Sequence, residues 1–284
     1  MTKCGTVVLA GKPNVGKSTL LNALVGERLS IVSPKPQSTR TPVVGLLTRG
    51  DAQFIFTDSP GLLDPQYRLQ EVMRQVALRA LTDAELIAYL HPLTEHPAPE
   101  LKTAAGLARA LETPVVTVYT KADLVPADRR PALSAGSVAV SAATGEGIAA
   151  LLGELERYLP ASPFHYDADE LATQPLRFFA AEYVREAAFA ILHEELPYSV
   201  ACEIDEFREA ETPAYIRAVV YVERDSQKGI VIGQGGRTIK AIGQAARARI
   251  ESLMGRPVYL DLHVKVLPRW RTHDPSLKRL GYAP

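Results

Sequence analysis

The stretch Gly11-Lys-Pro-Asn-Val-Gly-Lys-Ser18 decides the fold of this 284-residue chain. It matches the pattern G-x-x-x-x-G-K-[ST] at every specified position, and it lies between a predicted strand at 6–10 and a predicted helix at 17–25. The glycines let the backbone curl so that successive N–H groups and the positive end of the helix point at phosphate oxygens. Lys17 is then placed to reach the outer phosphates, and Ser18 to put its hydroxyl on Mg²⁺. The stretch therefore predicts a nucleotide phosphate loop.

Around this loop, short apolar runs alternate with amphipathic stretches as far as residue 160. We predict strands at 6–10, 54–57, 86–89, 115–119 and 138–140, and helices at 17–25, 67–81, 101–111 and 148–159. Such alternation predicts an α/β domain at 1–160, with a mostly parallel sheet and helices on both of its faces. The stretch 161–175, rich in Pro, Ala and acidic residues, is a predicted linker.

Three short segments downstream favour a guanine nucleotide. Asp58-Ser-Pro-Gly61 follows a predicted strand, so that the carboxylate is placed to hold Mg²⁺ through water and the glycine amide to sense the γ-phosphate. In Thr120-Lys-Ala-Asp123, the carboxylate can accept from the ring N–H and the amine of guanine, a pair that adenine lacks. Ser141-Ala-Ala143 offers a backbone amide to the base carbonyl.

The predicted nucleotide site has seventeen members. They are Gly11, Lys12, Pro13, Asn14, Val15, Gly16, Lys17, Ser18, Thr19, Asp58, Gly61, Thr120, Lys121, Asp123, Ser141, Ala142 and Ala143.

The composition limits the remaining possibilities. The chain is 46% apolar and 23% charged, which is typical of soluble globular proteins, and no apolar run has the length of about 18 residues that a membrane span needs. Two distant cysteines favour a reducing compartment. The net charge is zero, yet residues 228–284 carry 11 Lys and Arg against 3 Asp and Glu. This basic end predicts a polyanionic partner.

Beyond residue 175 the pattern becomes α+β. We predict, in order, a helix at 176–196, strands at 200–207 and 214–222, helices at 227–232 and 237–253, and a strand at 258–266. The stretch Val231-Ile-Gly-Gln-Gly-Gly236 between the two later helices resembles the glycine loop of type II KH domains, where a nucleic-acid backbone approaches closely. The predicted RNA contacts are Lys228, Ile232, Gly233, Gln234, Gly235, Gly236, Arg237, Lys240 and Arg247. Trp270 fits either a base-stacking residue or a packed aromatic.

Taken together, the motifs at 11–18, 58–61, 120–123 and 141–143 resemble the signature set of the TrmE-Era-EngA group of GTPases. Pro36-Gln-Ser-Thr-Arg40 resembles the first switch of that group, in which a threonine contacts Mg²⁺; Thr39 matches, and Thr41 remains an alternative. The resemblance implies Ser18, Thr39 and Asp58 around Mg²⁺. It also implies a potassium ion at Asn14 in place of an arginine finger. Leu62 stands where many small GTPases have a water-orienting glutamine, so hydrolysis should be slow without other help. The implied catalytic residues are Lys17, Asn14, Thr39 and Gly61.

A GTPase domain joined to a KH domain at 176–284 resembles the bacterial ribosome-assembly GTPases of that group. Glu195-Leu-Pro-Tyr198 and Leu280-Gly-Tyr282 extend the resemblance over nearly the whole chain. It implies a GTP-hydrolysing switch that binds the 3′ region of small-subunit (16S) ribosomal RNA and the immature small subunit. It further implies a cytoplasmic monomer with peripheral association at the inner membrane.

Three other functions compete with this one. A pure RNA-binding module with a vestigial nucleotide domain is disfavoured by the intact Lys17, Ser18, Asp58 and Asp123. A signalling or membrane-remodelling GTPase is disfavoured by the glycine loop and its basic helix, and use of ATP is disfavoured by Asp123. One departure from the resembled pattern is Thr120, which stands in the place of an asparagine.

Overall fold

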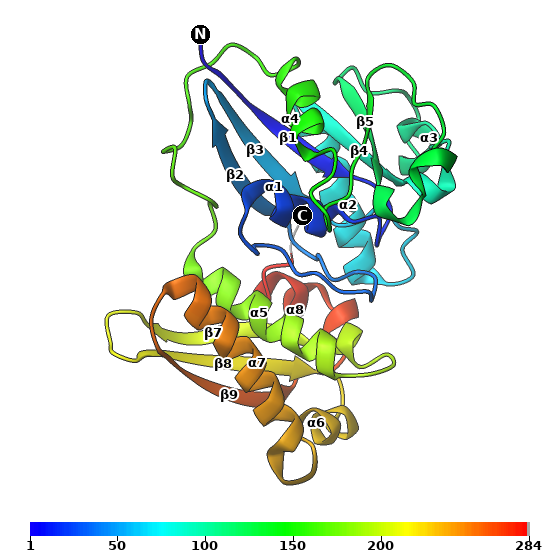
Figure 1. Ribbon diagram of the computed structural model, residues 1–284. Coiled ribbons are helices and arrows are strands. Elements are labelled where there is room, and N and C mark those ends of the chain that lie inside the picture. The colour runs from blue at the N-terminus through cyan, green and yellow to red at the C-terminus, as the bar shows by residue number, and fades with distance from the viewer. Residues whose placement is uncertain (283–284) are drawn as a thin grey trace.

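The computed structural model describes residues 1–282, so the last two residues of the predicted KH part lie outside it. In Figure 1 the first half of the chain stands above the second. The elements of the first half are β1 (Lys3–Ala10), α1 (Lys17–Val25), β2 (Val43–Arg49), β3 (Ala52–Asp58), α2 (Arg68–Asp83), β4 (Leu86–Pro92), α3 (Leu101–Ala105), β5 (Val115–Thr120), β6 (Ser137–Ala139) and α4 (Ile148–Glu156).

Within the described residues, the strands of the first half form one sheet in the order β2-β3-β1-β4-β5-β6. Every neighbouring pair is parallel except β2 and β3, which are antiparallel and joined by the turn at Gly50–Asp51. The expectation of a mostly parallel sheet is confirmed. The carboxyl ends of β1, β3 and β5 lie at one edge of the sheet, where the loops that carry the predicted nucleotide residues meet.

Two elements of the first half differ from the sequence prediction. Strand β2 was missed, because its residues Val43–Arg49 directly follow the predicted switch and carry no alternation of their own. Helix α3 ends at Ala105 and not at residue 111. Gly106 adopts a left-handed φ of 64° there, and its N–H caps the helix on the carbonyls of Lys102 and Thr103, which is the common way for a glycine to stop a helix.

The second half has the predicted order of helix, strand, strand, helix, helix and strand. These elements are α5 (Leu176–Ile191), β7 (Ala201–Arg208), β8 (Ala214–Val222), α6 (Asp225–Ile232), α7 (Arg237–Met254) and β9 (Val258–Val266). Within the described residues the strands form a sheet in the order β7-β8-β9, with β7 and β8 antiparallel and β8 and β9 parallel. The sequence did not predict α8 (Asp274–Arg279), which is too short to show periodicity.

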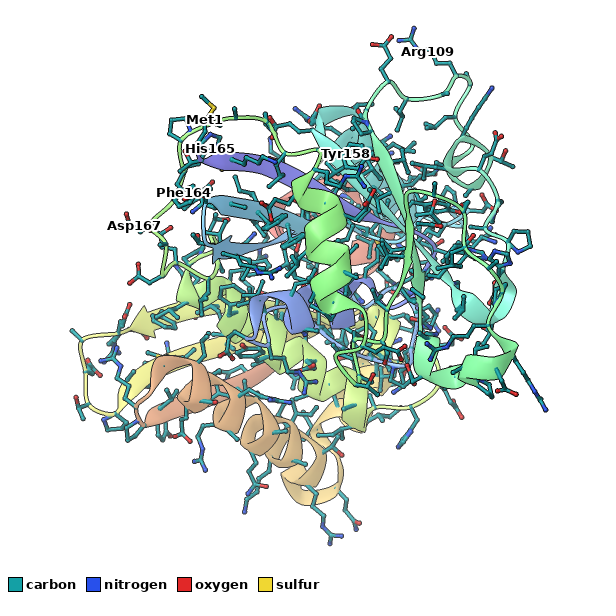
Figure 2. The ribbon with its side chains drawn as sticks, turned by 45° about the horizontal axis from the view of Figure 1, so that its top comes forward. Met1, Arg109, Tyr158, Phe164, His165 and Asp167 are labelled. Atoms are coloured by element: carbon teal, nitrogen blue, oxygen red, sulfur yellow. The ribbon has the colours of Figure 1, made fainter. Side chains whose placement is uncertain are left out.

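The connecting segment 160–175 lies along the first sheet. Leu46 N–H donates to the Leu171 carbonyl at 2.9 Å, and the His165 N–H donates to Oε1 of Gln53 at 2.8 Å. Phe164 packs against Cys4, Leu46 and Ile55, at the end of the molecule that also carries Met1 (Figure 2). The predicted linker is therefore bound to strands β2 and β3 by hydrogen bonds and apolar packing over much of its length.

The two halves share an apolar core that involves Trp270. Leu69 and Met73 of α2 pack with Trp270, Leu277 and Tyr282 of the C-terminal segment. Trp270 is fully buried, and its indole N–H donates to the Ser199 carbonyl at 2.9 Å. The packed-aromatic interpretation of this residue is thus correct, and the base-stacking one is wrong.

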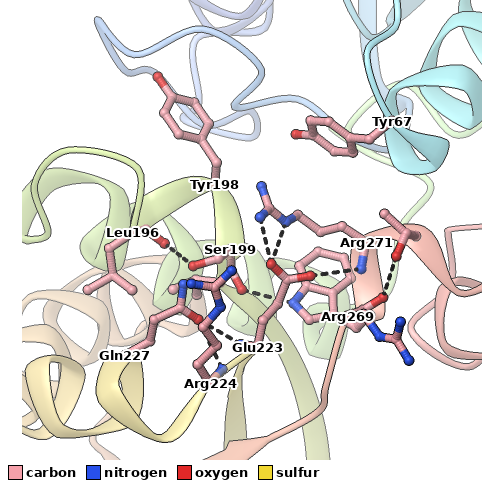
Figure 3. Close-up of polar contacts among 12 residues, drawn as sticks. Tyr67, Leu196, Tyr198, Ser199, Glu223, Arg224, Gln227, Arg269 and Arg271 are labelled. Atoms are coloured by element: carbon pink, nitrogen blue, oxygen red, sulfur yellow. Dashed lines mark hydrogen bonds and ion pairs between the residues drawn. The ribbon is translucent and has the colours of Figure 1, made fainter.

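A charged pair borders this core in Figure 3. Glu223 accepts from Nη2 of Arg271 at 2.6 Å, and the Arg271 guanidinium lies 5.1 Å from the ring centre of Tyr67, which precedes α2. The region around α2 is therefore held to the second half of the chain by apolar packing and by a cation–π contact.

Arg40 extends from the predicted first switch into the second half of the chain. Its guanidinium is buried and donates to the carbonyls of Val200 at 2.6 Å and Tyr198 at 3.0 Å. It also lies 5.5 Å from the ring centre of Trp270 and 5.9 Å from that of Tyr282. Since Thr39 and Arg40 are neighbours in sequence, the predicted first switch is joined directly to this aromatic pocket.

We expect Arg40→Ala to lower the free energy of unfolding by about 2–3 kcal/mol. The substitution leaves buried carbonyls without a hydrogen-bond donor and opens a cavity among aromatic rings. Trp270 is the only tryptophan of the chain, so denaturant unfolding followed by its fluorescence measures the effect. Arg79→Ala is the control, since this exposed arginine forms a surface ion pair with Asp83 and its loss should cost less than about 1 kcal/mol. Equal stability of the two variants would contradict the role of Arg40.

Candidate functional site

The phosphate loop brings Lys17 to the end of β1. Helix α1 begins immediately after Gly16, and the buried Lys17 ammonium donates to the carbonyls of Gly11 at 3.2 Å and Lys12 at 3.0 Å. Burial lowers the pKa of Lys17 to about 8, and the nearby charge of Asp58 opposes part of that shift. A phosphate at this loop would favour the charged ammonium, because an adjacent anion raises the pKa of an amine.

Opposite the loop, Gly61 lies against Pro13. A Cβ at position 61 would come within 2.7 Å of the Pro13 nitrogen, so only glycine allows the two backbones to lie this close. Leu62, the next residue, is buried in the core with Val8 and Ala10. The position that holds a water-orienting group in many GTPases thus faces the interior here.

Ser18, Thr39 and Asp58 come together although they are far apart in the sequence. The Ser18 hydroxyl donates to Oδ2 of Asp58 at 2.7 Å, and Oγ1 of Thr39 lies 3.0 Å from Oγ of Ser18 and 3.3 Å from Oδ2 of Asp58. Oδ1 of Asp58 is buried without a hydrogen-bond partner among residues 1–282. Two hydroxyls and a buried carboxylate are hard oxygen donors, which fits Mg²⁺. Of the two candidate threonines, Thr39 is the one in this cluster.

Ser18 and Thr39, together with Lys17 and Gly61, line a cleft of about 410 Å³. Its wall also contains the segment Ile31–Pro34, and Nδ2 of Asn14 donates to the Pro34 carbonyl at 2.9 Å. Because Asn14 donates through Nδ2, its amide oxygen is not used in this bond. A neutral oxygen of this kind can coordinate K⁺.

The predicted guanine-reading residues lie at the carboxyl ends of β5 and β6. The Thr120 hydroxyl donates to the Val15 carbonyl at 2.6 Å, so this threonine still ties the base loop to the phosphate loop in the place of an asparagine. Lys121 lines the cleft, while Asp123 is exposed beside it. The N–H of Ala122 donates to the Val140 carbonyl at 3.1 Å, which holds the loop of Asp123 beside Ser141, Ala142 and Ala143.

A residue pair that the sequence analysis missed joins these two loops. Arg130 donates to the carbonyls of Ala122 at 2.9 Å and Val125 at 3.0 Å, and it forms a two-pronged ion pair with Glu146. Arg130 and Glu146 are both partly exposed and belong to no motif. No signal in the sequence separates them from ordinary surface charges.

The second half carries a groove between α7 and β9. It has a volume of about 320 Å³ and is lined by Ile239, Lys240, Gly243, Gln244, Arg247, Leu260 and Leu262. Lys240 and Arg247 were predicted as RNA contacts. Leu260 and Leu262 were not, because a strand residue that faces a groove has the same pattern as one that faces the core.

The predicted glycine loop lies between α6 and α7, at the end of the groove helix. Gln234 and Gly235 are exposed, and Gly235 has a left-handed φ of 62° with open space around the position of a Cβ. Arg237 and Lys240 are exposed on the first turns of α7, whereas Ile232 and Lys228 are partly buried on α6. The loop thus presents bare backbone beside a basic helix, as backbone-binding modules do.

Comparison with known proteins agrees with this geometry. Residues 6–121 match a family described as 50S ribosome-binding GTPase, and residues 195–271 match the KH domain family. The GTPase Era of Caldanaerobacter subterraneus subsp. tengcongensis is 40% identical over 99% of this chain and 98% of its own length. That of Thermotoga maritima is 40% identical over 96% and 94%.

Two solved structures are similar over 100% of both chains, each at 36% identity. One is a variant of Aquifex aeolicus Era bound to GDP and AlF4⁻, with a TM-score of 0.93. The other is Era in complex with MgGDPNP and nucleotides 1506–1542 of 16S ribosomal RNA, with a TM-score of 0.92. Both contain a nucleotide, and one also contains RNA.

Proposed function

Because the chain belongs to the Era family of GTPases, we propose that it is a GTP-driven switch that binds the 3′ region of 16S ribosomal RNA and assists maturation of the small ribosomal subunit. The family description that mentions the 50S subunit covers only residues 6–121. The relative solved with 16S RNA aligns with the whole chain, so we favour the small subunit. We propose functional boundaries at 1–160, 161–175 and 176–284.

One observation supports the coupling of nucleotide to RNA more than any other. Thr39 lies in the Ser18–Asp58 cluster, and the next residue, Arg40, is buried among aromatic rings of the RNA-binding half. In the proposed mechanism, GTP orders Thr39 and the segment 58–61, and loss of the γ-phosphate releases them. Arg40 then carries this change to the second half of the chain.

The residues of the cleft have separate proposed roles in hydrolysis. Lys17 and the backbone N–H groups of 11–19, except at Pro13, would bind the phosphates, and the Gly61 N–H would donate to the γ-phosphate. Ser18, Thr39 and Asp58 would hold Mg²⁺, which when bound neutralises charge on the β- and γ-phosphates. With Leu62 buried, no side chain at that position orients the attacking water, so we propose slow intrinsic turnover and a potassium site at Asn14.

We expect GTP hydrolysis to be at least about tenfold faster in K⁺ than in Na⁺, a smaller gain than the 10³–10⁵ of an arginine finger. Asn14→Ala should remove the difference by lowering the rate in K⁺ alone. Phosphate release at matched ionic strength measures both rates. Equal wild-type rates in the two salts would contradict the potassium site.

Sedimentation with small ribosomal subunits tests the proposed partner. We expect the protein to sediment with immature small subunits in a GTP analogue and to be released in GDP, while large subunits retain none. Equal retention by both subunits would exclude the assignment to the small subunit.

Within residues 1–282 the structure has no helix long and apolar enough to cross a membrane. We propose membrane association only as peripheral, and flotation with vesicles measures it.

A further inference from the structure

The segment 28–35, which forms one wall of the nucleotide cleft, is held from two sides. It contains neither helix nor strand. On the side of the GTPase half, the Asn22 amide accepts from the N–H groups of Leu29 and Ser30, both at 2.9 Å, and donates to the Ser30 carbonyl at 2.9 Å. Because the segment lacks the regular backbone hydrogen bonds of a helix or sheet, its conformation depends on side-chain contacts such as those of Asn22.

The second set of contacts comes from the RNA-binding half, along helix α5. The Tyr183 hydroxyl donates to the Arg28 carbonyl at 2.8 Å. At the other end of the segment, Nζ of Lys35 donates to the carbonyls of Phe189 and Leu192. The region of helix α5 is therefore hydrogen-bonded to both ends of segment 28–35, although helix and segment are about 150 residues apart in the sequence.

Glu186 lies on α5 between these two sets of contacts and hydrogen-bonds to the middle of segment 28–35. The Glu186 side chain is only 11% exposed, and its Oε1 accepts from Nη2 of Arg28 at 2.6 Å and from the Val32 N–H at 3.2 Å. A buried carboxylate needs such donors, because an unpaired buried charge is costly. Here one of the donors is a backbone amide of the cleft wall.

The bond to Val32 fixes the orientation of one peptide plane. The N–H of Val32 and the C=O of Ile31 belong to the same trans peptide unit, so they point in opposite directions. With the N–H held toward α5, the Ile31 carbonyl is turned away from α5, and Ile31 itself lines the cleft that contains Asn14, Lys17 and Ser18. The hydrogen bond from Val32 to Glu186 thus sets the orientation of the Ile31–Val32 peptide group at the wall of the cleft.

We propose that Glu186, a residue of the RNA-binding half, is a positioning residue for GTP hydrolysis that fixes the backbone of segment 28–35 beside the phosphate site. The inference rests on the proposed function in that it assigns hydrolysis to this cleft and a cation to Asn14. It adds that the GTPase half alone does not contain all the groups that order its own site.

Three variants separate the possible roles of Glu186. Glu186→Ala removes both hydrogen bonds. Glu186→Gln keeps an amide oxygen that accepts from Val32, and Arg28→Met removes the ion pair while leaving the bond to Val32. Glu195→Ala, at an exposed glutamate just beyond α5, is the matched control.

The first readout is amide hydrogen exchange in the nucleotide-free protein. Glu186→Ala should speed exchange in segment 28–35 by at least about tenfold, as expected from loss of a hydrogen bond to a charged group. Glu186→Gln, Arg28→Met and the control should stay within about threefold of wild type. Unchanged exchange in Glu186→Ala overturns the inference.

The second readout is the potassium concentration that gives half-maximal binding of fluorescent GDP with aluminium fluoride. Glu186→Ala should raise this concentration about fivefold or more and lower kcat for GTP about tenfold, with affinity for GDP alone within about twofold. If wild type shows no potassium dependence, the proposed role of Asn14 fails. If wild type depends on potassium and Glu186→Ala has the same half-maximal concentration, the positioning role of Glu186 is wrong.

Discussion

Asp123→Asn is expected to weaken GDP binding by at least about 100-fold and to create affinity for XDP. In the proposed site the carboxylate of Asp123 would accept from two donors of guanine, whereas an asparagine amide would place its own donor against one of them. Xanthine has a carbonyl where guanine has the amine, so it pairs with that amide. A site built to hydrogen-bond a group rejects ligands that lack it by large factors. Titration with fluorescent GDP and XDP measures both affinities.

Asp128→Asn supplies the control for this exchange of nucleotide preference. Asp128 is exposed a few residues further along the same loop and has no predicted contact with the base. Asp123 is also exposed, so neither variant should disturb folding. An Asp123→Asn protein that keeps its affinity for GDP, or gains affinity for ADP, would show that the base is read elsewhere.

The second large effect is expected from Gln234→Asp combined with Gly235→Asp, which should reduce affinity for single-stranded RNA by at least about 100-fold. In the proposed interface, two carboxylates would stand where the phosphate backbone is expected to approach, and they would replace electrostatic attraction by repulsion. Aspartate tolerates the left-handed conformation of Gly235 better than most residues, and among residues 1–282 no atom beyond the adjoining residues lies within 4 Å of the added Cβ.

The same loop contains a glycine that should not be used for this test. A Cβ at Gly233 would come within 2.2 Å of Oγ1 of Thr238, so a substitution there would distort the start of α7. Gly50→Asp is the matched control, because Gly50 also has a left-handed φ, 56°, and open space, but lies in the turn between β2 and β3. GTP turnover of the loop variant should stay within about twofold of wild type. Unchanged RNA affinity would remove the loop from the interface.

Local chemistry made much of the site predictable from the sequence. The phosphate loop needs glycines and Lys17 at fixed spacing, and the structure places Ser18, Thr39 and Asp58 together as the motifs imply. The sequence favoured Thr39 by its match to the first switch but left Thr41 open, because two threonines two residues apart cannot be separated without the path of the backbone. Only the fold shows that Thr39 reaches Asp58.

Contacts between the two halves could not be predicted, because no motif records them. Arg40 and Glu186 are single charged residues on segments with other evident roles, and each becomes informative only when its partner is known. Trp270 shows the same limit, since a tryptophan between two arginines has one sequence pattern whether it stacks on a base or fills a core. Burial of its indole against Ser199 decides between them.

The most direct test of the central claim is the binding of a labelled single strand that copies the 3′ tail of 16S ribosomal RNA. Its affinity would be compared at fixed salt in the GTP-analogue, GDP and nucleotide-free states, with the loop variant alongside. We expect loop-dependent binding that differs by about 5–150-fold between the GTP-analogue and GDP states, the usual range for coupling between two sites. Equal affinity in all three states, or binding that survives the loop substitutions, would contradict a GTP-driven switch acting through this RNA.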